Sequence, residues 1–420
     1  MTADSIDILA ASLFALALVH TFAAKQFERL SHRFPRHAGL YHLLGEVEVV
    51  FGFWAIVLVA AMAFVSSGKE ALSYAESRNY TEPLFVFVVM VIAASRPVLE
   101  TVVWVVQAMA RLLPVPTRLA TVWLGLAAVP LMGSLITEPA AMTIAALMLA
   151  PQVFRKEVPE SAKYVALGAL FVNVSIGGTL TSYAAPPVLM VAATWQWDSA
   201  FMLVHFGWKA AVAVVLNATL ATFVLRGHLM KVASNHASAL PQARMPFTVV
   251  AVHLALLAGV IVLAHYPVAF LAIFLLFLGA AQAYERYQSP LLIKEALLVA
   301  FFLAGLVVLG GLQRWWLQPI VSALEPLALF FGALGLTAVT DNAALTYLGS
   351  QISGMSEQAK YMLVAGAVAG GGLTVIANAP NPAGLALLKR GFSDESVGAG
   401  GLFLGALGPT AIACALFLLL

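Results

Sequence analysis

Two acidic residues, Glu138 and Asp341, lie inside long apolar stretches of the sequence. Placing a charge at the depth of a lipid bilayer costs at least ~2.5–3.5 kcal/mol, so such a residue predicts a functional role. A buried carboxylate is suited to exchange chemistry, because it can hold either a proton or a cation and burial favours its neutral form. We therefore ask how the rest of the chain positions these two carboxylates.

The two acids belong to a pattern that occurs twice. Residues 137–143 read TEPAAMT, and residues 340–346 read TDNAALT. Three further features follow each copy in the same order: an Ala-Lys-Tyr triplet (162–164 and 359–361), a glycine-rich segment (177–181, GGTLT, and 370–374, GGGLT), and two prolines (Pro186 and Pro187; Pro380 and Pro382). This order predicts an internal repeat of the kind found in transporters.

Composition identifies the class of protein. The 420 residues are 62% hydrophobic and only 10% charged, whereas soluble domains average about 25% charged residues. Apolar runs near the ~20 residues needed to cross a bilayer recur, so we expect an all-α polytopic membrane protein. The net charge of +2 gives no indication of a nucleic-acid partner. The only cysteine, Cys414, lies in the last apolar run, which excludes a disulfide framework.

The apolar runs divide the chain into two similar halves joined by a linker. The first repeat, residues 1–225, is expected to contain spans over 6–24, 43–65, 84–110 (interrupted at Arg96-Pro97) and 200–225, a re-entrant hairpin over 118–152, and a broken helix over 162–197. The second repeat, residues 247–420, is expected to contain spans over 247–264, 267–283, 294–312 and 397–420, a hairpin over 325–352, and a broken helix over 359–388.

Each half therefore has five crossings and one hairpin. Because five is odd, the second half is expected to be inverted relative to the first. Loop charge supports this register: the loops assigned to the cytoplasm, including a linker over 226–246, hold 16 Lys and Arg residues, and those assigned outside hold four. Both termini are then expected outside. The first apolar run precedes its basic residues, unlike a cleavable signal peptide, and so reads as an anchoring helix.

The breaks in the apolar runs could bind ions. Irregular backbone is tolerated at membrane depth only where it is buried in protein or lines a cavity, and the ends of half-helices can coordinate ions there. Asp341 and Asn342 offer adjacent carboxylate and amide oxygens, which hard cations prefer. The alternative is that Glu138 and Asp341 only cap the helices that follow them.

Two other sets of charged residues lie in or beside the apolar runs. Arg96 and Glu100 lie four residues apart in the third span, so they share a helix face. We expect a structural pair of buried charges; the other hypothesis is that Arg96 competes with a transported cation. Glu46 and Glu48 begin the second span and are expected at the membrane interface.

At these motifs the chain resembles a known group. Residues 177–181 and 370–381 (GGGLTVIANAPN) are similar to the broken-helix motif of the ion transporter superfamily, which includes divalent-anion/sodium symporters, arsenite permeases and NhaD-type sodium/proton antiporters. The carboxylate symporters carry a neutral Ser-Asn-Thr at each hairpin tip. The acidic tip at 340–342 instead resembles the antiporter and arsenite-permease branches, and the sodium/proton antiporter group most of all. The first repeat departs from the pattern, since residues 183–187 (YAAPP) lack the asparagine seen near Pro380.

The resemblance implies a secondary active transporter, often homodimeric, in a bacterial-type inner membrane. We expect a sodium/proton antiporter in which Asp341 and Glu138 carry the ions, with Asp341 and Asn342 as the principal sodium ligands. Neutral oxygens at the site are expected from Thr340, Thr137, Asn378, Asn381, Thr374 and Thr181. Lipid, protons and monovalent cations are the expected partners, and no cofactor is expected beyond the transported Na+ and H+.

Two other functions remain open. A sodium-coupled anion (dicarboxylate) or arsenite transporter could use the same fold, but it predicts a basic substrate contact at the tips, and neither motif contains one. An intramembrane enzyme would need a nucleophile–base pair, and Ser134 and Ser182 have no histidine in the same motif. We therefore expect no enzymatic activity.

Overall fold

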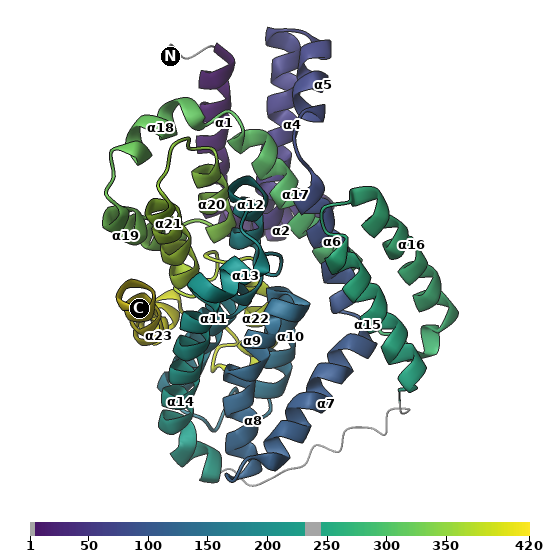
Figure 1. Cartoon of the computed structure of the whole chain (residues 1–420), viewed down its shortest axis with the longest axis vertical. Coiled ribbons are helices and arrows are strands. Elements are labelled where there is room, and N and C mark those ends of the chain that lie inside the picture. Colours follow the sequence, from purple (N-terminus) through teal and green to yellow (C-terminus); the bar gives the residue numbers. More distant parts are fainter. Residues whose placement is uncertain (1–4, 232–244) are drawn as a thin grey trace.

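The computed structural model describes residues 5–231 and 245–420, and every regular element within these ranges is helical (Figure 1). The helices up to residue 231 are α1 (Ser5–Phe22), α2 (Ala24–Arg33), α3 (Ala38–Gly45), α4 (Val47–Val65), α5 (Gly68–Glu76), α6 (Thr81–Ala93), α7 (Arg96–Leu112), α8 (Thr117–Leu126), α9 (Ala128–Ile136), α10 (Glu138–Leu149), α11 (Glu160–Gly177), α12 (Pro186–Trp195), α13 (Ser199–Met202) and α14 (Trp208–Lys231).

From residue 245 onward the helices are α15 (Phe247–Val262), α16 (Pro267–Ala283), α17 (Ile293–Gly310), α18 (Arg314–Ser322), α19 (Pro326–Thr337), α20 (Asn342–Ser350), α21 (Glu357–Gly370), α22 (Asn381–Leu388) and α23 (Ala399–Leu419). Within the described ranges, six continuous helical segments are long and apolar enough to cross a membrane. Two bent pairs pass the same test, α6 with α7 (65°) and α8 with α9 (42°), which raises the number to eight. The chain is a multi-pass membrane protein.

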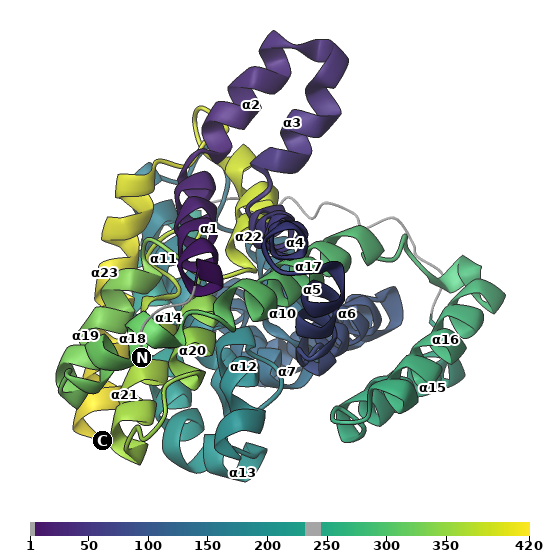
Figure 2. The same ribbon diagram turned by 90° about the horizontal axis from the view of Figure 1, so that it is seen from above.

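The eight candidates differ from the ten expected crossings in identifiable ways. Seven of them are expected crossings, and the eighth, α8 with α9, was expected to be one arm of a hairpin. Three expected crossings contain shorter helices: α15 has 16 residues, α16 has 17 and α21 has 14. Figure 2 shows α15 and α16 paired at one side of the molecule, where they pack on α6 and α7.

Three expected boundaries are corrected by the structure. The segment 25–42, expected to be a loop, forms most of the paired helices α2 and α3. Helix α14 continues to Lys231, so the first six residues of the expected linker 226–246 are helical, and 232–244 lie outside the described residues. The third span breaks at Ala94 and Ser95 rather than at Arg96-Pro97. Pro97 lies in the first turn of α7, a position that does not need its missing N–H.

Helix breaks occur at both acidic motifs. Helices α9 and α10 are separated by Thr137 alone, and α10 packs back on α8 and α9 (Figure 1). Helices α19 and α20 are separated by residues 338–341. The helices that follow break as expected, with residues 178–185 between α11 and α12 and residues 371–380 between α21 and α22. Whether the halves form an inverted repeat remains a prediction.

The elements of the two halves are interleaved. Helix α11 packs on α23, α12 packs on α20, and α10 packs on α22. Close crossing of the two broken helices requires glycine: a Cβ atom on Gly372 would collide with the Val172 backbone of α11. The breaks of both halves therefore meet in the interior of one molecule.

Candidate functional site

Thr137 forms the first tip and has a strained backbone. Its φ of 84° and ψ of 151° are rare for a β-branched residue. The side chain is 3% exposed, and its Oγ1 atom has no hydrogen-bond partner among the described residues. Such strain persists only where the surroundings enforce it, and it is concentrated at functional sites. Here it allows α10 to begin at once with Glu138.

Glu138 is completely buried and bonds to the other half of the chain. Its Oε2 atom accepts a hydrogen bond of 2.8 Å from Asn378 Nδ2, and Oε1 has no partner in the described structure. Gly178 makes room for the carboxylate, since a Cβ atom there would lie 2.6 Å from Oε1. A buried carboxylate with one free oxygen is a strong acceptor for a proton or a cation.

Asp341 has a different environment. Its Oδ1 atom accepts hydrogen bonds from the backbone N–H groups of Ala343 (2.8 Å) and Ala344 (3.2 Å), so it is the N-cap of α20. The side chain is partly exposed. The capping alternative is therefore observed at Asp341. It is not observed at Glu138, which lies inside the first turn of α10.

The segment between α21 and α22 connects the two tips. The backbone N–H of Asn342 donates to the carbonyl oxygen of Ala377 (3.1 Å), and the next residue, Asn378, bonds to Glu138. Asn342 Nδ2 also lies 3.5 Å from Ser175 Oγ on α11. Asp341 is close enough to Glu138 for a direct electrostatic interaction. Both predicted carboxylates are thus brought to one region.

Four other predicted residues bond to nearby backbone. Asn381 Nδ2 donates to the carbonyls of Gly371 (2.8 Å) and Thr374 (2.9 Å). The threonine hydroxyls also donate to carbonyls: Thr374 to Ala338 (2.8 Å), Thr181 to Ser134 (2.7 Å) and Thr340 to Leu336 (2.8 Å). The first two of these hydroxyl bonds tie each broken-helix segment to the hairpin of its own half.

Several oxygen atoms of the site share one property. They are buried and have no hydrogen-bond partner in the described chain: Thr137 Oγ1, Glu138 Oε1, Asn342 Oδ1, Asn378 Oδ1 and Asn381 Oδ1. Buried polar atoms are normally paired, so a group of unpaired acceptors requires an explanation. Carboxylate, amide and hydroxyl oxygens are the ligands that hard cations prefer. The site is therefore chemically suited to a cation such as sodium.

The Arg96–Glu100 pair forms as predicted, at 2.6 Å, but it is not fully buried. Its side chains are 21% and 34% exposed. Neither residue is among the hydrogen-bond partners of Glu138 or Asp341. The expected ion pair within α7 therefore forms, and competition of Arg96 with a transported cation stays a hypothesis.

Two cavities lie beside the breaks. One, of about 410 Å³, is lined by residues that include Glu46, Glu48, Thr137, Pro139 and Pro380; we call it the Glu48 cavity. Sequence reasoning placed Glu46 and Glu48 only at the interface. Their Glu-x-Glu spacing was visible, but nothing in the sequence indicated that they face the tip carrying Glu138.

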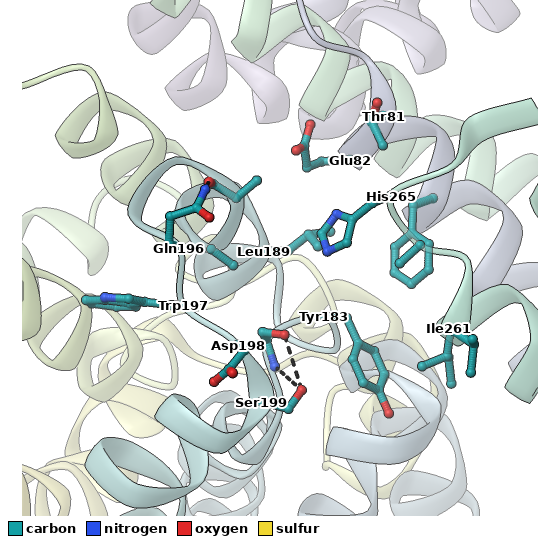
Figure 3. Close-up of a pocket in the computed structure, with 16 residues that line it drawn as sticks. Thr81, Glu82, Tyr183, Leu189, Gln196, Trp197, Asp198, Ser199, Ile261 and His265 are labelled. Carbon is teal, nitrogen blue, oxygen red and sulfur yellow. Dashed lines mark hydrogen bonds between the residues drawn. The ribbon is translucent and has the colours of Figure 1, made fainter.

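The second cavity, of about 540 Å³, borders the break between α11 and α12 (Figure 3). Glu82 and His265 approach from one side, while Tyr183 and Asp198 lie on the other. Ser182 is held to Ser199 through its N–H and its hydroxyl, each at 3.2 Å. No residue of either acidic motif lines this cavity. The Glu48 cavity is thus the one that adjoins the site.

These features define a multi-pass membrane protein with a buried, oxygen-rich site at helix breaks, and the family match identifies it as a transporter. The chain belongs to the family described as "Putative Na+/H+ antiporter", whose model matches residues 5–420. The family expected from the sequence motifs is confirmed.

Among solved structures, the chain is similar to the YdaH transporter of Alcanivorax borkumensis, at 12% identity and a TM-score of 0.45. The match covers 89% of this chain and 96% of that one. Among curated proteins, none matches the sequence.

Proposed function

We propose that this protein exchanges sodium for protons across the membrane, with Glu138 as the central exchange group. The observation that carries this proposal is the buried Glu138–Asn378 contact, which leaves Glu138 Oε1 unpaired among other unpaired oxygens. A proton on the carboxyl group, or a cation among these oxygens, would each neutralise the buried charge. The two states exclude one another, which is the requirement for exchange.

The contacts support a different order of the two acids from the one expected from the sequence. The sequence favours Asp341, because Asn342, Asn378 and Asn381 belong to its half of the chain. In the structure, however, Asn378 donates a hydrogen bond to Glu138. One carboxylate oxygen of Asp341 accepts a hydrogen bond that caps α20. We assign Glu138 as the principal sodium ligand, with Asn378 and Asn342 as neutral ligands. Asp341 is the second, more accessible carrier.

A proton-flux assay in proteoliposomes tests the function. Sodium, lithium, potassium and a dicarboxylate are supplied in turn, and the internal pH is followed. Sodium or lithium should drive proton release in the unmodified protein. Uptake of the dicarboxylate with sodium, without proton exchange, would contradict the proposal and support the anion-transporter alternative. The basic side chain of Lys294 in the Glu48 cavity is the one feature that favours that alternative.

We further propose the inverted topology, in an inner membrane, with both termini outside and a homodimeric assembly. Lys156 and Gln358 are exposed residues that follow the first and second acidic motifs. In a variant in which Cys414 is replaced by alanine, a cysteine at Lys156 should react with an impermeant reagent only from the cytoplasm. A cysteine at Gln358 should react only from outside. Reaction of both from the same side would refute the inversion.

A further inference from the structure

The Glu48 cavity carries an excess of negative charge. Glu46, Glu48 and Glu295 line it, and Lys294 is the one lysine or arginine among its described lining residues. Lys294 Nζ lies 3.5 Å from Glu46 Oε1, so one acid is partly compensated. Glu46 Oε2 is buried without a hydrogen-bond partner in the described structure. No basic side chain pairs with Glu48 among the ion pairs found in the described chain.

Glu48 shares the wall of this cavity with Glu46. It is also close enough to Glu46 and to Asp341 to interact with both electrostatically. Like charges that share a low-dielectric region repel one another unless a proton or a cation joins them. The negative charge on the wall of this cavity is therefore not fully compensated by the protein, and diffusible cations can compensate it.

A second observation points to a ligand. Thr137, 3% exposed, lines the same cavity with an unpaired Oγ1 atom, and Pro139 lines it on the other side of Glu138. Glu138, which lies between these two residues in the sequence, is completely buried. The cavity thus borders both sequence neighbours of the exchange group. The cavity's volume of about 410 Å³ also leaves room for several water molecules around an ion, each with a share of about 30 Å³ in the liquid.

We propose that the Glu48 cavity is a second cation site, at which Glu48 and Glu46 hold a partly hydrated monovalent cation before it passes Thr137 to reach Glu138. Lys294 acts there as a tethered competitor, because its ammonium group occupies Glu46 when no ion is present. This inference rests on the proposed antiporter function. It adds a site that raises the local cation concentration on one side of the membrane only.

The test measures the sodium KM of exchange separately for sodium presented on each membrane side, in right-side-out and inside-out vesicles. Glu48→Gln should raise the KM about tenfold for sodium on the cavity side and leave the KM from the other side unchanged. Lys294→Met should lower the cavity-side KM. Glu285→Gln is the matched control, since Glu285 is an exposed acid that does not line the cavity.

A chemical rescue separates charge from shape. In the background without Cys414, Glu48→Cys should have the raised cavity-side KM. A negatively charged sulfonate reagent should restore it, and a positively charged ammonium reagent should raise it further. An unchanged KM in Glu48→Gln, or equal effects of the two reagents, would overturn the second site. Glu138→Gln in the same vesicles separates this result from a failure of the proposed function. If Glu138→Gln is inactive, only the second site is overturned. If Glu138→Gln is active, the proposed antiporter function is overturned.

Discussion

The two acidic tips share a sequence pattern but differ in structure. At the first tip a single strained residue, Thr137, separates two helices, and the carboxylate of Glu138 is buried against Asn378 of the other half. At the second tip four residues intervene, and the carboxylate of Asp341 bonds to its own helix. A repeated motif therefore does not imply repeated chemistry. The contacts favour the first tip for ion binding and the second for helix capping with an accessory charge.

The largest effect is expected from Glu138→Gln. The amide keeps the shape of the side chain but cannot release a proton, so sodium-driven proton flux should fall to the background of protein-free liposomes. Because the amide remains a hydrogen-bonding group, the variant should still fold. Gel-filtration elution and thermal unfolding check that point. Retention of exchange near the unmodified level would show that Glu138 is not the exchange group. The proposed difference between the two tips would then be wrong.

A smaller effect is expected at Asp341, where two substitutions separate charge from capping. Asp341→Asn keeps a good N-cap but removes the charge near Glu138, so exchange should fall about tenfold with little change in stability. Asp341→Ala should lose the same activity and in addition destabilise the protein by ~1 kcal/mol, because α20 loses its cap. Sodium-driven proton flux and thermal unfolding of both variants are the measurements, and calorimetry of sodium binding complements them. Complete loss of binding in Asp341→Asn, with binding preserved in Glu138→Gln, would restore the ranking favoured by the sequence.

The corresponding glycines of the two breaks give a third comparison. Gly178→Ala introduces a Cβ atom 2.6 Å from Glu138 Oε1 and should weaken sodium binding several-fold with the fold retained, because the carboxylate must shift. Gly371→Ala instead collides with the hydroxyl of Ser175 and approaches Asn342 Nδ2. It should mainly reduce stability, by ~1–3 kcal/mol. Thermal unfolding and sodium titration are measured for both variants. The two variants would show the same pattern if the tips had equivalent roles.

The smallest effect is expected from the Arg96–Glu100 pair. The double variant Arg96→Gln, Glu100→Gln should leave the sodium KM within about twofold of the original, because the pair is partly exposed and the hydrogen bonds found for Glu138 and Asp341 involve other residues. Each single variant should lower folded yield more than the double variant does, since one charge then lacks its partner. A marked fall in the KM of the double variant would revive Arg96 as a competitor of the transported ion.

Local sequence features predicted much of this architecture. The helix breaks at 137, 178–185 and 371–380 follow from prolines and glycines within apolar runs, and the Arg96–Glu100 contact follows from helical spacing. The partner of Glu138 could not be predicted in the same way. Asn378 lies 240 residues away, and its position depends on how the broken helices cross rather than on any nearby pattern. The position of Glu48 on the same cavity as Thr137 could not be predicted either, because α4 meets the first tip only through tertiary packing.

The separation of 240 residues between Glu138 and Asn378 also means that the two partners are synthesised at different times. At synthesis rates of about 5–20 residues per second, Glu138 leaves the ribosome roughly 10–50 s before Asn378 exists. The growing chain must carry this acid into the lipid as a neutral, protonated group, or keep the first hairpin outside the membrane until its partner is translated. The contact between Glu138 and Asn378 thus forms late, only after 240 further residues have been synthesised. A chain truncated before α21 distinguishes the two routes. Protease should cut the first hairpin if it waits outside the membrane, and should not cut it if the acid inserts in its neutral form.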